Sequence, residues 1–559
     1  MLKDRIKDLV SAALENVLVK KDLKGKVKEK VFVVEKPANA SFGHFSTNVA
    51  MVYSKDFKDL YKGKSSAYGL ASELIEDLKA NKDLFDSVEI AGPGFINFRV
   101  TNSEWYKILA LIRQADQNWG KEGPKDKKIQ VEFVSSNPTG PLHVGHGRGA
   151  AWGDATSNIL SFLGYSVQRE YYINDAGNQI NSLGASVLFR LKNAPDTPMP
   201  DGLYKGSYIL EIANTLSQKH TEDYFKLPAS ELIADLSREA ANIILEDMKN
   251  DLDNFGVTFD NWFSERSLYE NGEVERSINT LKEKGYTYEK DGALFFRSTD
   301  FGDDKDRVLI KSDGDTTYFA SDVAYHANKF QRGFDLAIDV LGADHGGYQG
   351  RIAAVVEALG YSRDRVKIVL YQLVKLMRGK EIVKMSTRAG EFIPLKVVLD
   401  EVTPDAARFM YLSQSHDSAL DFDLELAKAK NNDNPVFYVQ YLCARIFQLC
   451  KKAQPILQGD SSQPDFSLLS EDVELSLIQQ LETFPYMLRS SGTNLAPHLV
   501  TVWLMETSKL FHHYYGEHRM ILEKDLALTR ARVALAATVR QVVGLGLTLL
   551  GISVPEHME

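Results

Sequence analysis

The chain has 559 residues, of which 44% are hydrophobic and 25% are charged. This length exceeds what one hydrophobic core supports, so we expect several domains of an ordinary globular protein. The sequence contains no run of about 18 apolar residues, the length typical of a membrane span, so we expect no membrane partner. The net charge of −10 argues against a protein that coats nucleic acid through charge alone. The basic stretch "VKKDLKGKVKEK" could bind a polyanion, although such a run more often forms a solvated face.

The first predicted element is a helix. The opening "MLKDRIKDLVSAALENVLVK" mixes charged and apolar residues at helical spacing and contains acids, unlike an export signal or a transit peptide. We therefore expect a surface helix in a cytoplasmic protein. The strands "KVFVVEKP" and "SVEIAGPGFINFRV" surround the helical segment "SAYGLASELIEDLKAN", which predicts a small α+β domain over residues 1–118.

A βαβ unit follows the predicted linker "QNWGKEGPKDKK". Strand "KIQVEFVSS" leads into a glycine-rich turn, a helix from about 146 to 163 that ends at Gly164, and strand "SVQREYYIN". Such a unit requires a parallel sheet. Residues 185–290 are mostly amphipathic helix and are interpreted as an insertion, whereas "DLAIDVLGADH" and "VKIVLYQLVKL" are predicted to complete the sheet. Residues 119–430 thus form a Rossmann-like α/β domain.

Residues 431–559 are predicted to be all-α, since helical periodicity continues from "NNDNPVFYVQYLCARIFQL" to the end. Cys443 and Cys450 lie seven residues apart in this segment, which fits two buried, reduced thiols better than a disulfide or a zinc site. The predicted fold class is therefore multidomain α/β: a small α+β domain, a Rossmann-like parallel-sheet domain with a helical insertion, and an all-α helical bundle.

The turn "NPTGPLHVGHGRGAAWGDA" carries the first chemical signal. A helix N-terminus behind a parallel strand offers free N–H groups and a positive dipole end, which suit a phosphate. The turn has neither G-x-G-x-x-G nor G-K-[ST], so it is not a dinucleotide fingerprint or a P-loop. His143 and His146 would stand at the mouth of the helix and could donate hydrogen bonds to phosphate oxygens, while Gly145 could let a purine lie against bare backbone.

Two other interpretations of the histidine pair compete with this one. They could bind zinc, although no third ligand with sensible spacing is nearby, or they could be idle surface residues. The second signal is "EIVKMSTRAGEF", a polar loop at 381–392 between Gly379 and Gly390. Alone, "KMS" is a chance match, but together with H-x-G-H about 240 residues upstream in an α/β chain it is specific.

The two motifs resemble those of the class I aminoacyl-tRNA synthetases, with "HVGH" as the HIGH motif and "KMSTR" as the KMSKS motif. More narrowly, the chain resembles the arginyl-tRNA synthetases over nearly its whole length. The segments that carry this resemblance are "GHFSTNVAM", "AGPGFINF", "SSNPTGPLHVGHGRG", "EYYINDAGNQI", "DGALFFRSTDFGDDKDRVL", "IDVLGADHGGY", "NPVFYVQY" and "ALAATVRQVVGLGLTLLGISVPEHM".

The resemblance implies that the chain ligates L-arginine to its tRNA in two steps through an arginyl-adenylate, with release of pyrophosphate and then of AMP. The nucleophile of the first step is the substrate carboxylate, so catalysis reduces to alignment and stabilisation of charge. The resemblance implies that His143, His146 and Lys384 are the catalytic residues. ATP is expected to carry Mg²⁺, and no protein-bound metal is expected. The residues implied for ATP binding are Asn137, Pro138, Thr139, Gly140, Pro141, Gly145, His345, Val383, Met385 and Ser386.

The KMSKS motif departs from the family pattern. Its second lysine is Thr387, followed by Arg388, and the sequence leaves open whether Arg388 replaces it. Some arginine enzymes lack the loop lysine and carry one just before the HIGH motif, where this chain has Thr139. The chain therefore resembles the branch that keeps the loop lysine, and Lys384 is expected to be important.

Arginine recognition requires groups that fit a planar guanidinium, namely carboxylates and an aromatic face. Tyr318 and Asp322 lie four residues apart and share a face if this segment is a helix. For any single carboxylate, an exposed surface charge is the competing interpretation. The resemblance implies that Glu132, Ser135 and Asn137 also bind the substrate, and Asp344 completes the set proposed for arginine binding with Tyr318 and Asp322.

The resemblance also implies contacts with tRNA. Phe95 and Asn97 match positions that the family uses to hold a base of the D-loop, although a strand core is the alternative for Phe95. The last helices resemble the DALR anticodon-binding bundle, and their aromatic residues could stack on bases, although core packing explains most of them. These aromatic residues include Tyr438, Tyr441, Phe511, Tyr514 and Tyr515. The expected partners are tRNA for arginine, L-arginine and ATP, and the family suggests a monomer.

Three alternative functions fit these residues less well. A nucleotidylyltransferase shares the HIGH-type site but usually needs no helical tail of about 120 residues. A non-enzymatic tRNA-binding paralogue would have lost His143, His146 or Lys384, and all three are present. Within the synthetases, the cysteine and glutamate enzymes are the nearest alternatives, and the "FINF" domain argues against them.

Overall fold

The computed structural model of the chain describes residues 1–37, 39–61, 66–383, 393–458 and 462–558. The chain divides into two compact units. Unit 1 comprises Met1–Trp119, Arg445–Phe484 and Lys509–Val542, and unit 2 comprises Gly120–Ala444, Pro485–Ser508 and Val543–Glu559. This division passes through the C-terminal helices, whereas the three domains expected from the sequence are contiguous, and their boundaries stay a prediction.

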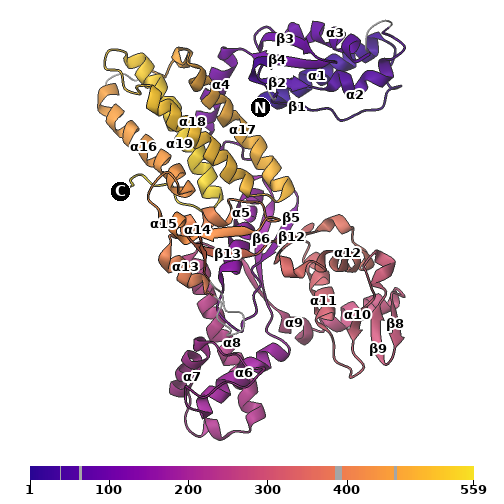
Figure 1. The fold of residues 1–559 in the computed structure, drawn as a ribbon. Coiled ribbons are helices and arrows are strands. Elements are labelled where there is room, and N and C mark those ends of the chain that lie inside the picture. Colours follow the sequence, from indigo (N-terminus) through magenta and orange to yellow (C-terminus); the bar gives the residue numbers. More distant parts are fainter. Residues whose placement is uncertain (38, 62–65, 384–392, 459–461, 559) are drawn as a thin grey trace. The chain divides into compact units, whose positions relative to one another are not determined.

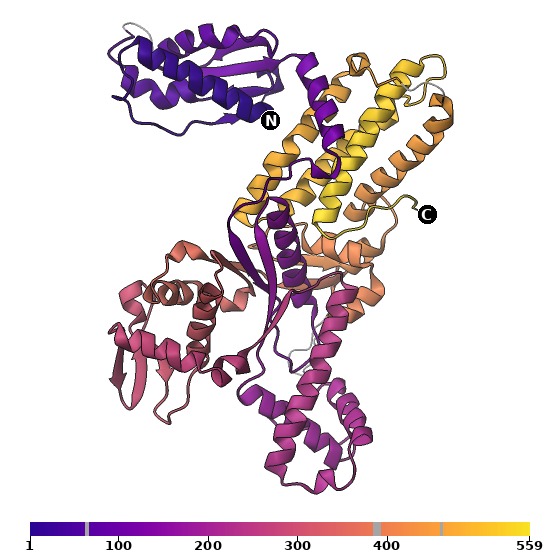
Figure 2. The ribbon, with the colours of Figure 1, turned by 180° about the vertical axis from the view of Figure 1, so that it is seen from behind.

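Unit 1 begins with a small α+β domain, as the sequence predicts. Its strands are β1 (Val34–Glu35), β2 (Phe45–Thr47), β3 (Phe85–Ala91) and β4 (Phe95–Val100), and its helices are α1 (Leu2–Lys20), α2 (Val49–Tyr53), α3 (Ser66–Lys79) and α4 (Asn102–Ala115). The strands form an antiparallel sheet in the order β1-β2-β4-β3, and α1 packs on α3 and β1 (Figure 2). In β4 the fully buried Ile96 and Phe98 alternate with Phe95 and Asn97, so these pairs face opposite sides of the sheet.

Long helices make up the C-terminal part of the chain, as predicted: α16 (Pro435–Leu457), α17 (Asp472–Asn494), α18 (His498–Glu517) and α19 (Leu526–Leu549). Within unit 1, the buried Glu474 carboxylate accepts hydrogen bonds from the Tyr514 hydroxyl at 2.8 Å and from Arg532 Nε at 2.9 Å. This contact joins α17, α18 and α19. Cys443 and Cys450 are free thiols, but Cys450 is only half-buried, in contrast to the prediction.

Helix α19 is also, by length and composition, the one helix among the described residues that is apolar enough to cross a membrane. In the structure, 78% of its most apolar window is buried inside the protein. The apolar character of α19 is thus that of a core helix packed by its neighbours.

Unit 2 is built on a five-stranded parallel sheet. Its strands are β5 (Lys128–Phe133), β6 (Ser166–Ile173), β7 (Asn261–Ser264), β11 (Leu336–Gly342) and β12 (Val366–Tyr371), in the order β12-β11-β5-β6-β7. Helix α5 (Val144–Phe162) connects β5 to β6, packs on β5, β6 and β11, and is followed by Gly164 with a φ of 85°. The predicted βαβ unit and Rossmann-like sheet are confirmed. Because the strands are parallel, their carboxyl ends reach the same edge.

The sequence-based interpretation of 185–290 as helical insertion is wrong at β7, which forms the edge of this sheet beside β6. The strand has four residues, "NWFS", too few for an alternating pattern to stand out between helices. Its place depends on tertiary contacts, since Trp262 stacks on Tyr171 of β6 with ring centroids 4.4 Å apart. The next residue, Glu265, therefore lies at the carboxyl edge of the sheet.

The segment "VKIVLYQLVKL" is also predicted only in part. Its first half is β12, but its second half is β13 (Val374–Arg378), which belongs to a separate sheet with β14 (Glu381–Ile382) and β15 (Leu420–Asp423). Gln372 and Leu373 interrupt the two strands, and the backbone N–H of Gln372 donates to the carbonyl of His416. Helices α13 (Leu395–Glu401), α14 (Pro404–Tyr411) and α15 (Leu424–Lys428) accompany this second sheet.

The remaining elements of unit 2 form two groups, which Figure 1 shows on either side of the strands. One group contains α6 (Asn178–Lys192), α7 (Ser207–Lys219) and α8 (Ala229–Asn254), which pack on one another. The other contains α9 (Glu265–Glu270), α10 (Glu273–Glu283), α11 (Tyr318–Gln331), α12 (Tyr348–Ala358) and the antiparallel strands β8 (Thr287–Lys290), β9 (Ala293–Phe296) and β10 (Arg307–Ile310) around a shared apolar core.

A buried polar network ties this second group to the sheet. The fully buried Glu170 of β6 accepts hydrogen bonds from both terminal nitrogens of Arg332, from Gln130 of β5, from Tyr325 of α11 and from Asn261 of β7. A bidentate arginine and three neutral donors compensate the burial of one carboxylate. The network therefore holds three adjacent strands and α11 in one arrangement.

The glycines that follow the "HVGH" motif allow close packing of helix α5. Gly147, Gly149 and Gly153 lie inside α5, where each faces a large side chain. A Cβ atom on Gly153 would lie 2.1 Å from Cγ of Phe133, and one on Gly149 would lie 2.8 Å from Cε1 of Tyr371. These glycines let α5 approach the sheet closely.

Gly153→Ala should therefore destabilise unit 2, by about 1–3 kcal/mol as expected for an overpacked core. Chemical denaturation monitored by tryptophan fluorescence measures this change. Gly350→Ala is the matched control, because Gly350 lies in α12 and a Cβ atom added there would meet no atom within 4 Å, so alanine should be neutral or slightly stabilising. Equal stability of the two variants would contradict the close approach of α5.

Candidate active site

The residues singled out in the sequence of unit 2 gather at the carboxyl edge of the parallel sheet. β5 lies between β6 and β11, and the chain continues from β5 to β6 on one side and reaches β11 and β12 on the other. In an open α/β sheet this is the switch point at which ligands bind. The "HVGH" turn follows β5, and "GADH" follows β11 as a short 3₁₀ helix, Ala343–His345.

His143 and His146 cap the N-terminus of α5 through reciprocal hydrogen bonds. The backbone N–H of Gly145 donates to Nδ1 of His143 at 3.1 Å, and the backbone N–H of His143 donates to Nδ1 of His146 at 3.2 Å. The two rings stack with centroids 3.6 Å apart. Because each Nδ1 accepts a hydrogen bond, we assign the proton of each neutral imidazole to Nε2. Both histidines are therefore prepared to donate from Nε2.

The environment keeps this imidazole pair neutral. Burial lowers the pKa of His143, and burial together with His143 lowers the pKa of His146 to about 3. The negative charge of Asp344 partly offsets this effect, because it raises the pKa of His143. The pair thus supplies polar N–H donors at a helix N-terminus without carrying a positive charge at neutral pH.

The turn between β5 and α5 has a strained start. Val134 and Ser135 have φ angles of 67° and 41°, in the left-handed region that a β-branched residue such as valine rarely adopts. Such outliers cluster at functional sites, where the surrounding structure enforces them. Here the Ser135 hydroxyl donates to Glu132 at 3.0 Å and accepts the backbone N–H of Tyr172 at 3.1 Å, which fixes the direction of the turn.

The predicted ATP-binding residues of the turn contact the helical insertion. The Tyr208 hydroxyl of α7 donates to the carbonyl of Thr139 at 2.7 Å, and Asn137 donates to Gln179 of α6 at 2.7 Å. A Cβ atom on Gly140 would lie 3.3 Å from the Tyr208 oxygen. Pro138 and Thr139 are buried, Asn137, Gly140 and Gly145 are half-buried, and Pro141 is exposed.

The segment that follows the KMS loop lies beside the imidazole turn. Lys384, Met385, Ser386, Thr387 and Arg388 themselves lie outside the described residues. Before them, the backbone N–H of Val383 donates to the carbonyl of Leu376; after them, the carbonyl of Ile393 accepts the N–H of Val144, and the N–H of Leu395 donates to Leu142. The residues after the loop therefore pair directly with "HVGH".

The carboxylates proposed for arginine binding differ in how far they are already paired. Buried Glu132 accepts from Ser135 on Oε1 and from Lys329 Nζ on Oε2 at 2.7 Å, so both of its oxygens have partners. Half-buried Asp322 accepts only the Tyr348 hydroxyl at 2.9 Å through its side chain. Burial, with the nearby charge of Glu132, raises the pKa of Asp322 to about 6.

Tyr318 and Asp322 lie in the first turns of α11, so the helix that their spacing requires is present. Tyr318 is 58% exposed, and its hydroxyl lies 3.3 Å from where a Cβ atom on Gly177 would be. Asp344 and His345 are also exposed, with the His345 Nε2 atom 3.8 Å from Asp344. They stand at the end of β11, on the side of the imidazole pair.

Several residues at this edge were missed from the sequence. Glu265 follows β7, Tyr172 and Asp175 come from the end of β6 and the residues after it, and Lys329 comes from α11. Asp175 accepts the Ser264 hydroxyl and the backbone N–H of Arg266. The segment "INDAG" after strand "SVQREYYIN" was the available signal for Asp175, since it marks the carboxyl end of a predicted parallel strand.

Phe95 and Asn97, which are predicted to bind tRNA, fall in unit 1. They lie on the face of β4 opposite the fully buried Ile96 and Phe98, where Phe95 is half-buried and Asn97 is buried. Among the C-terminal aromatic residues, Phe511 and Tyr514 are fully buried and belong to the core. Tyr438, Tyr441 and Tyr515 are half-buried, and the Arg445 guanidinium lies over the Tyr515 ring at 4.9 Å.

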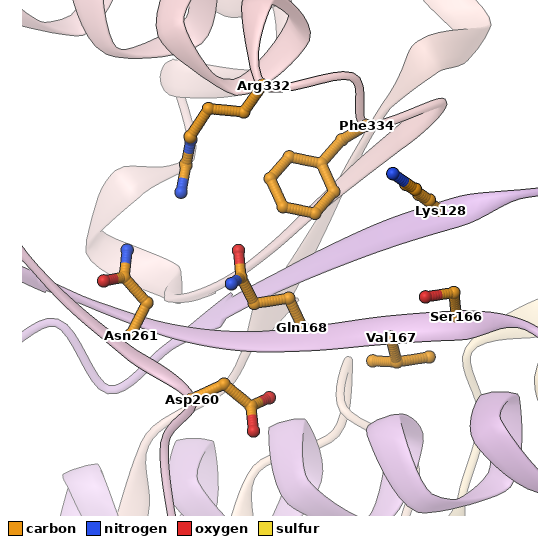
Figure 3. A pocket seen from close by; sticks show the side chains of 8 residues that line it. All are labelled: Lys128, Ser166, Val167, Gln168, Asp260, Asn261, Arg332 and Phe334. Carbon is orange, nitrogen blue, oxygen red and sulfur yellow. The ribbon is translucent and has the colours of Figure 1, made fainter.

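A cavity lies elsewhere in unit 2. It has a volume of about 600 Å³ and is lined by Lys128, Ser166, Val167, Gln168, Asp260, Asn261, Arg332 and Phe334. Figure 3 shows Arg332 and Phe334 facing Gln168 and Asn261 across it. It is at the amino ends of β5, β6 and β7, the edge opposite the imidazole pair. Within the described part of the chain, no group of three or more His, Cys, Asp or Glu side chains is arranged to hold a metal ion.

Comparisons with known proteins agree with this geometry. Residues 4–100 match the arginyl tRNA synthetase N terminal domain, residues 107–423 match the tRNA synthetases class I (R) catalytic domain, and residues 439–558 match the DALR anticodon binding domain. The parallel sheet, the imidazole-capped turn and the catalytic-domain match define a class I aminoacyl-tRNA synthetase.

Whole-chain similarity specifies the family. The arginine–tRNA ligase of Geobacter sp. (strain M21) is 48% identical over 533 residues, which cover 94% of each chain, and that of Syntrophotalea carbinolica is 44% identical over 563 residues, which cover 100% of each. The arginyl-tRNA synthetase structure of Thermus thermophilus covers 100% of both chains with a TM-score of 0.78; its 21% identity supports the fold alone. The chain belongs to the arginyl-tRNA synthetase family. The nucleotidylyltransferase, cysteine and glutamate alternatives are therefore wrong.

The neutral imidazole of His146 has a consequence for stability. Since its pKa is about 3 in the folded chain against 6.5 for an ordinary histidine, protonation favours the unfolded state as pH falls below 6.5. The wild-type chain should lose about 1 kcal/mol more unfolding free energy between pH 6.5 and pH 5.5 than His146→Asn, which keeps a capping acceptor but does not titrate. Chemical denaturation at the two pH values measures this, and identical pH dependence would contradict the neutral, buried state of His146.

Proposed function

We propose that the chain ligates L-arginine to its cognate tRNA in two steps. In the first step, the arginine carboxylate attacks the α-phosphate of ATP, which carries Mg²⁺, so that arginyl-adenylate forms and pyrophosphate leaves. In the second step, a hydroxyl of the terminal ribose of tRNA attacks the acyl carbon, and AMP leaves. The substrates themselves supply the nucleophile in both steps, so the protein needs to align them and stabilise charge.

The observation that carries this proposal is the imidazole cap of α5. His143 and His146 each use Nδ1 to accept a backbone N–H, which assigns the proton of each ring to Nε2, beside a helix N-terminus. Preformed donors at such a place stabilise the negative charge that builds on a phosphate during displacement. Because both imidazoles are neutral, their role is hydrogen bonding rather than proton transfer.

Lys384 is proposed to supply a positive charge for the leaving pyrophosphate. Support comes from the anchoring of the segment after it, since Ile393 and Leu395 pair with the backbone of Val144 and Leu142. Lys384 directly follows Val383, which is held by the carbonyl of Leu376. Val383, Met385, Ser386, His345 and the residues of the turn from Asn137 to Pro141 are proposed to hold ATP.

The arginine side chain is proposed to enter the carboxylate-rich end of the site. Asp322 is the group with unused capacity, because its side chain accepts one hydroxyl and its pKa is raised to about 6 by burial. A guanidinium placed beside it would restore the charged form. Glu132, Ser135, Asn137, Tyr318 and Asp344 are proposed to complete the arginine site.

In unit 1, Phe95 and Asn97 are proposed to bind a base of tRNA. The half-buried ring of Phe95, on the face of β4 opposite Ile96 and Phe98, supports this, since RNA recognition uses splayed bases on aromatic side chains. The monomeric state stays a prediction from the family, and the cytoplasmic location stays a prediction from the sequence.

The proposal predicts exchange of labelled pyrophosphate into ATP that requires both L-arginine and tRNA for arginine. Exchange should be absent when lysine or citrulline replaces arginine, because neither presents a guanidinium. The purified chain with each amino acid in turn provides the test. Exchange with another amino acid and not with arginine would reassign the substrate.

Two isosteric variants separate the role of the His146 donor from that of its cap. His146→Asn keeps an acceptor near Nδ1 and loses the Nε2–H, and should lower adenylate formation about 100- to 1000-fold. His146→Gln places an amide near Nε2 and should retain more activity. Both should bind tRNA as the wild-type chain does in a filter assay. The reverse ranking of the two variants would mean that the cap, rather than the donor, determines the rate.

A further inference from the structure

His326 is a buried histidine of α11 whose two ring nitrogens both face oxygen atoms. Its exposed fraction is 1%. Nδ1 lies 2.8 Å from the backbone carbonyl oxygen of Asp322, one turn earlier in the same helix, and Nε2 lies 3.0 Å from Oδ2 of Asp339 in β11. Because a carbonyl oxygen only accepts hydrogen bonds, we assign a proton to Nδ1.

The second ring nitrogen faces a carboxylate that is held in its charged form. Burial favours the neutral form of Asp339, but the charge of Lys329 and the hydrogen bond from His326 outweigh it and lower the pKa of Asp339. Lys329 Nζ lies 2.7 Å from Oδ1 of Asp339. An ionised carboxylate has no proton to donate, so Nε2 of His326 must also carry one. With a proton on each nitrogen, His326 is a positively charged imidazolium.

This charge completes the balance of a buried cluster. Lys329 Nζ lies 2.7 Å from both Glu132 and Asp339, and both oxygens of Glu132 accept hydrogen bonds, one from Lys329 and one from Ser135. Lys329 alone would therefore leave one of the two carboxylates uncompensated, which is costly in the interior. The imidazolium of His326 supplies the second positive charge.

The same charge acts on Asp322. Burial raises the pKa of Asp322 to about 6, while the charge of His326 opposes the rise, as do the Tyr348 hydroxyl and the charge of Arg351. The charged and titratable groups that face Asp322 from other elements are Glu132 of β5, Tyr172 of β6, Glu265 of α9, and Tyr348 and Arg351 of α12. Among the partners in α11 itself, His326 is thus the group that favours the ionised carboxylate.

We propose that His326 is a positioning residue for arginine binding, whose imidazolium holds the carbonyl of Asp322 against β11 and favours the charged form of the Asp322 carboxylate. The inference rests on the proposed function and concerns a residue that does not itself touch the substrate. A charged carboxylate binds a guanidinium much more strongly than a neutral carboxyl group does. His326 therefore prepares Asp322 for the substrate before arginine arrives.

The pH dependence of arginine binding separates this role from simple packing. With a neutral residue at position 326, the pKa of Asp322 would rise above about 6, so that more of the carboxyl group would be protonated near neutral pH. Arginine binding should then weaken most below pH 7. Above pH 8, Asp322 is ionised with or without the imidazolium, and the difference should disappear.

His326→Gln in the full chain tests the inference, because it keeps an N–H donor and removes the charge. The KM for arginine in aminoacylation should rise about 3- to 10-fold at pH 6.5 and less than about 2-fold at pH 8.5, with an unchanged KM for ATP at both pH values. His220→Gln is the matched control, since His220 also lies 2.7 Å from a carboxylate, that of Glu239, but belongs to the helical insertion. Its variant should behave as the wild-type chain.

Equal rises in the arginine KM at the two pH values would overturn the inference, because they indicate lost packing, and so would an unchanged KM at pH 6.5. If His326→Gln does not fold, nitrogen-15 NMR of the histidine-labelled His220→Gln chain at pH 7.5 decides. A histidine ring with both nitrogens protonated supports the inference, and the absence of such a ring overturns it. A wild-type chain without arginine-dependent exchange would instead contradict the proposed function itself.

Discussion

The parallel pairing of five strands is the constraint on which the site depends. Because β12, β11, β5, β6 and β7 all run in one direction, residues that are far apart in the chain reach a single edge, and each connection must return on a face of the sheet. The Glu170 network holds three of these strands against α11. Small residues on α5 let its N-terminus come close to the strand ends. The sheet thus determines where the proposed ATP and arginine sites lie.

The imidazole pair shows how the fold assigns a chemical state. Histidine is usually discussed as a proton carrier near neutral pH, yet burial lowers the pKa of both rings, and the contact with His143 lowers the pKa of His146 further. Backbone N–H groups occupy both Nδ1 atoms, so the same contacts that begin a helix also select the tautomer. A role in holding a phosphate follows from this arrangement more directly than a role in proton transfer does.

The carboxylates at the acidic end of the site differ in their partners. Lys329 contacts both Glu132 and Asp339 in the interior, and Arg332 is bidentate on Glu170. The side chain of Asp322 accepts only the Tyr348 hydroxyl, and burial raises the pKa of Asp322 to about 6. The proposed arginine site would use this difference, because a carboxylate that forms no ion pair with a described side chain favours a permanent planar cation over neutral analogues.

The local sequence was sufficient for features set by short-range physics. The strand-turn-helix at 128–164, the helical C-terminal part and the imidazole turn follow from periodicity, glycine placement and motif spacing. The sequence left open whether Tyr318 and Asp322 lie on a helix, as they do in α11. Only the tertiary structure decided that "NWFS" is an edge strand and that β13 leaves the main sheet, because their pairing partners lie 91 and 46 residues away in the chain and short apolar runs depend on such tertiary contacts. The position of Glu265 at the carboxyl edge of the sheet could not be predicted for the same reason, since it follows a strand that forms only when β6 is beside it.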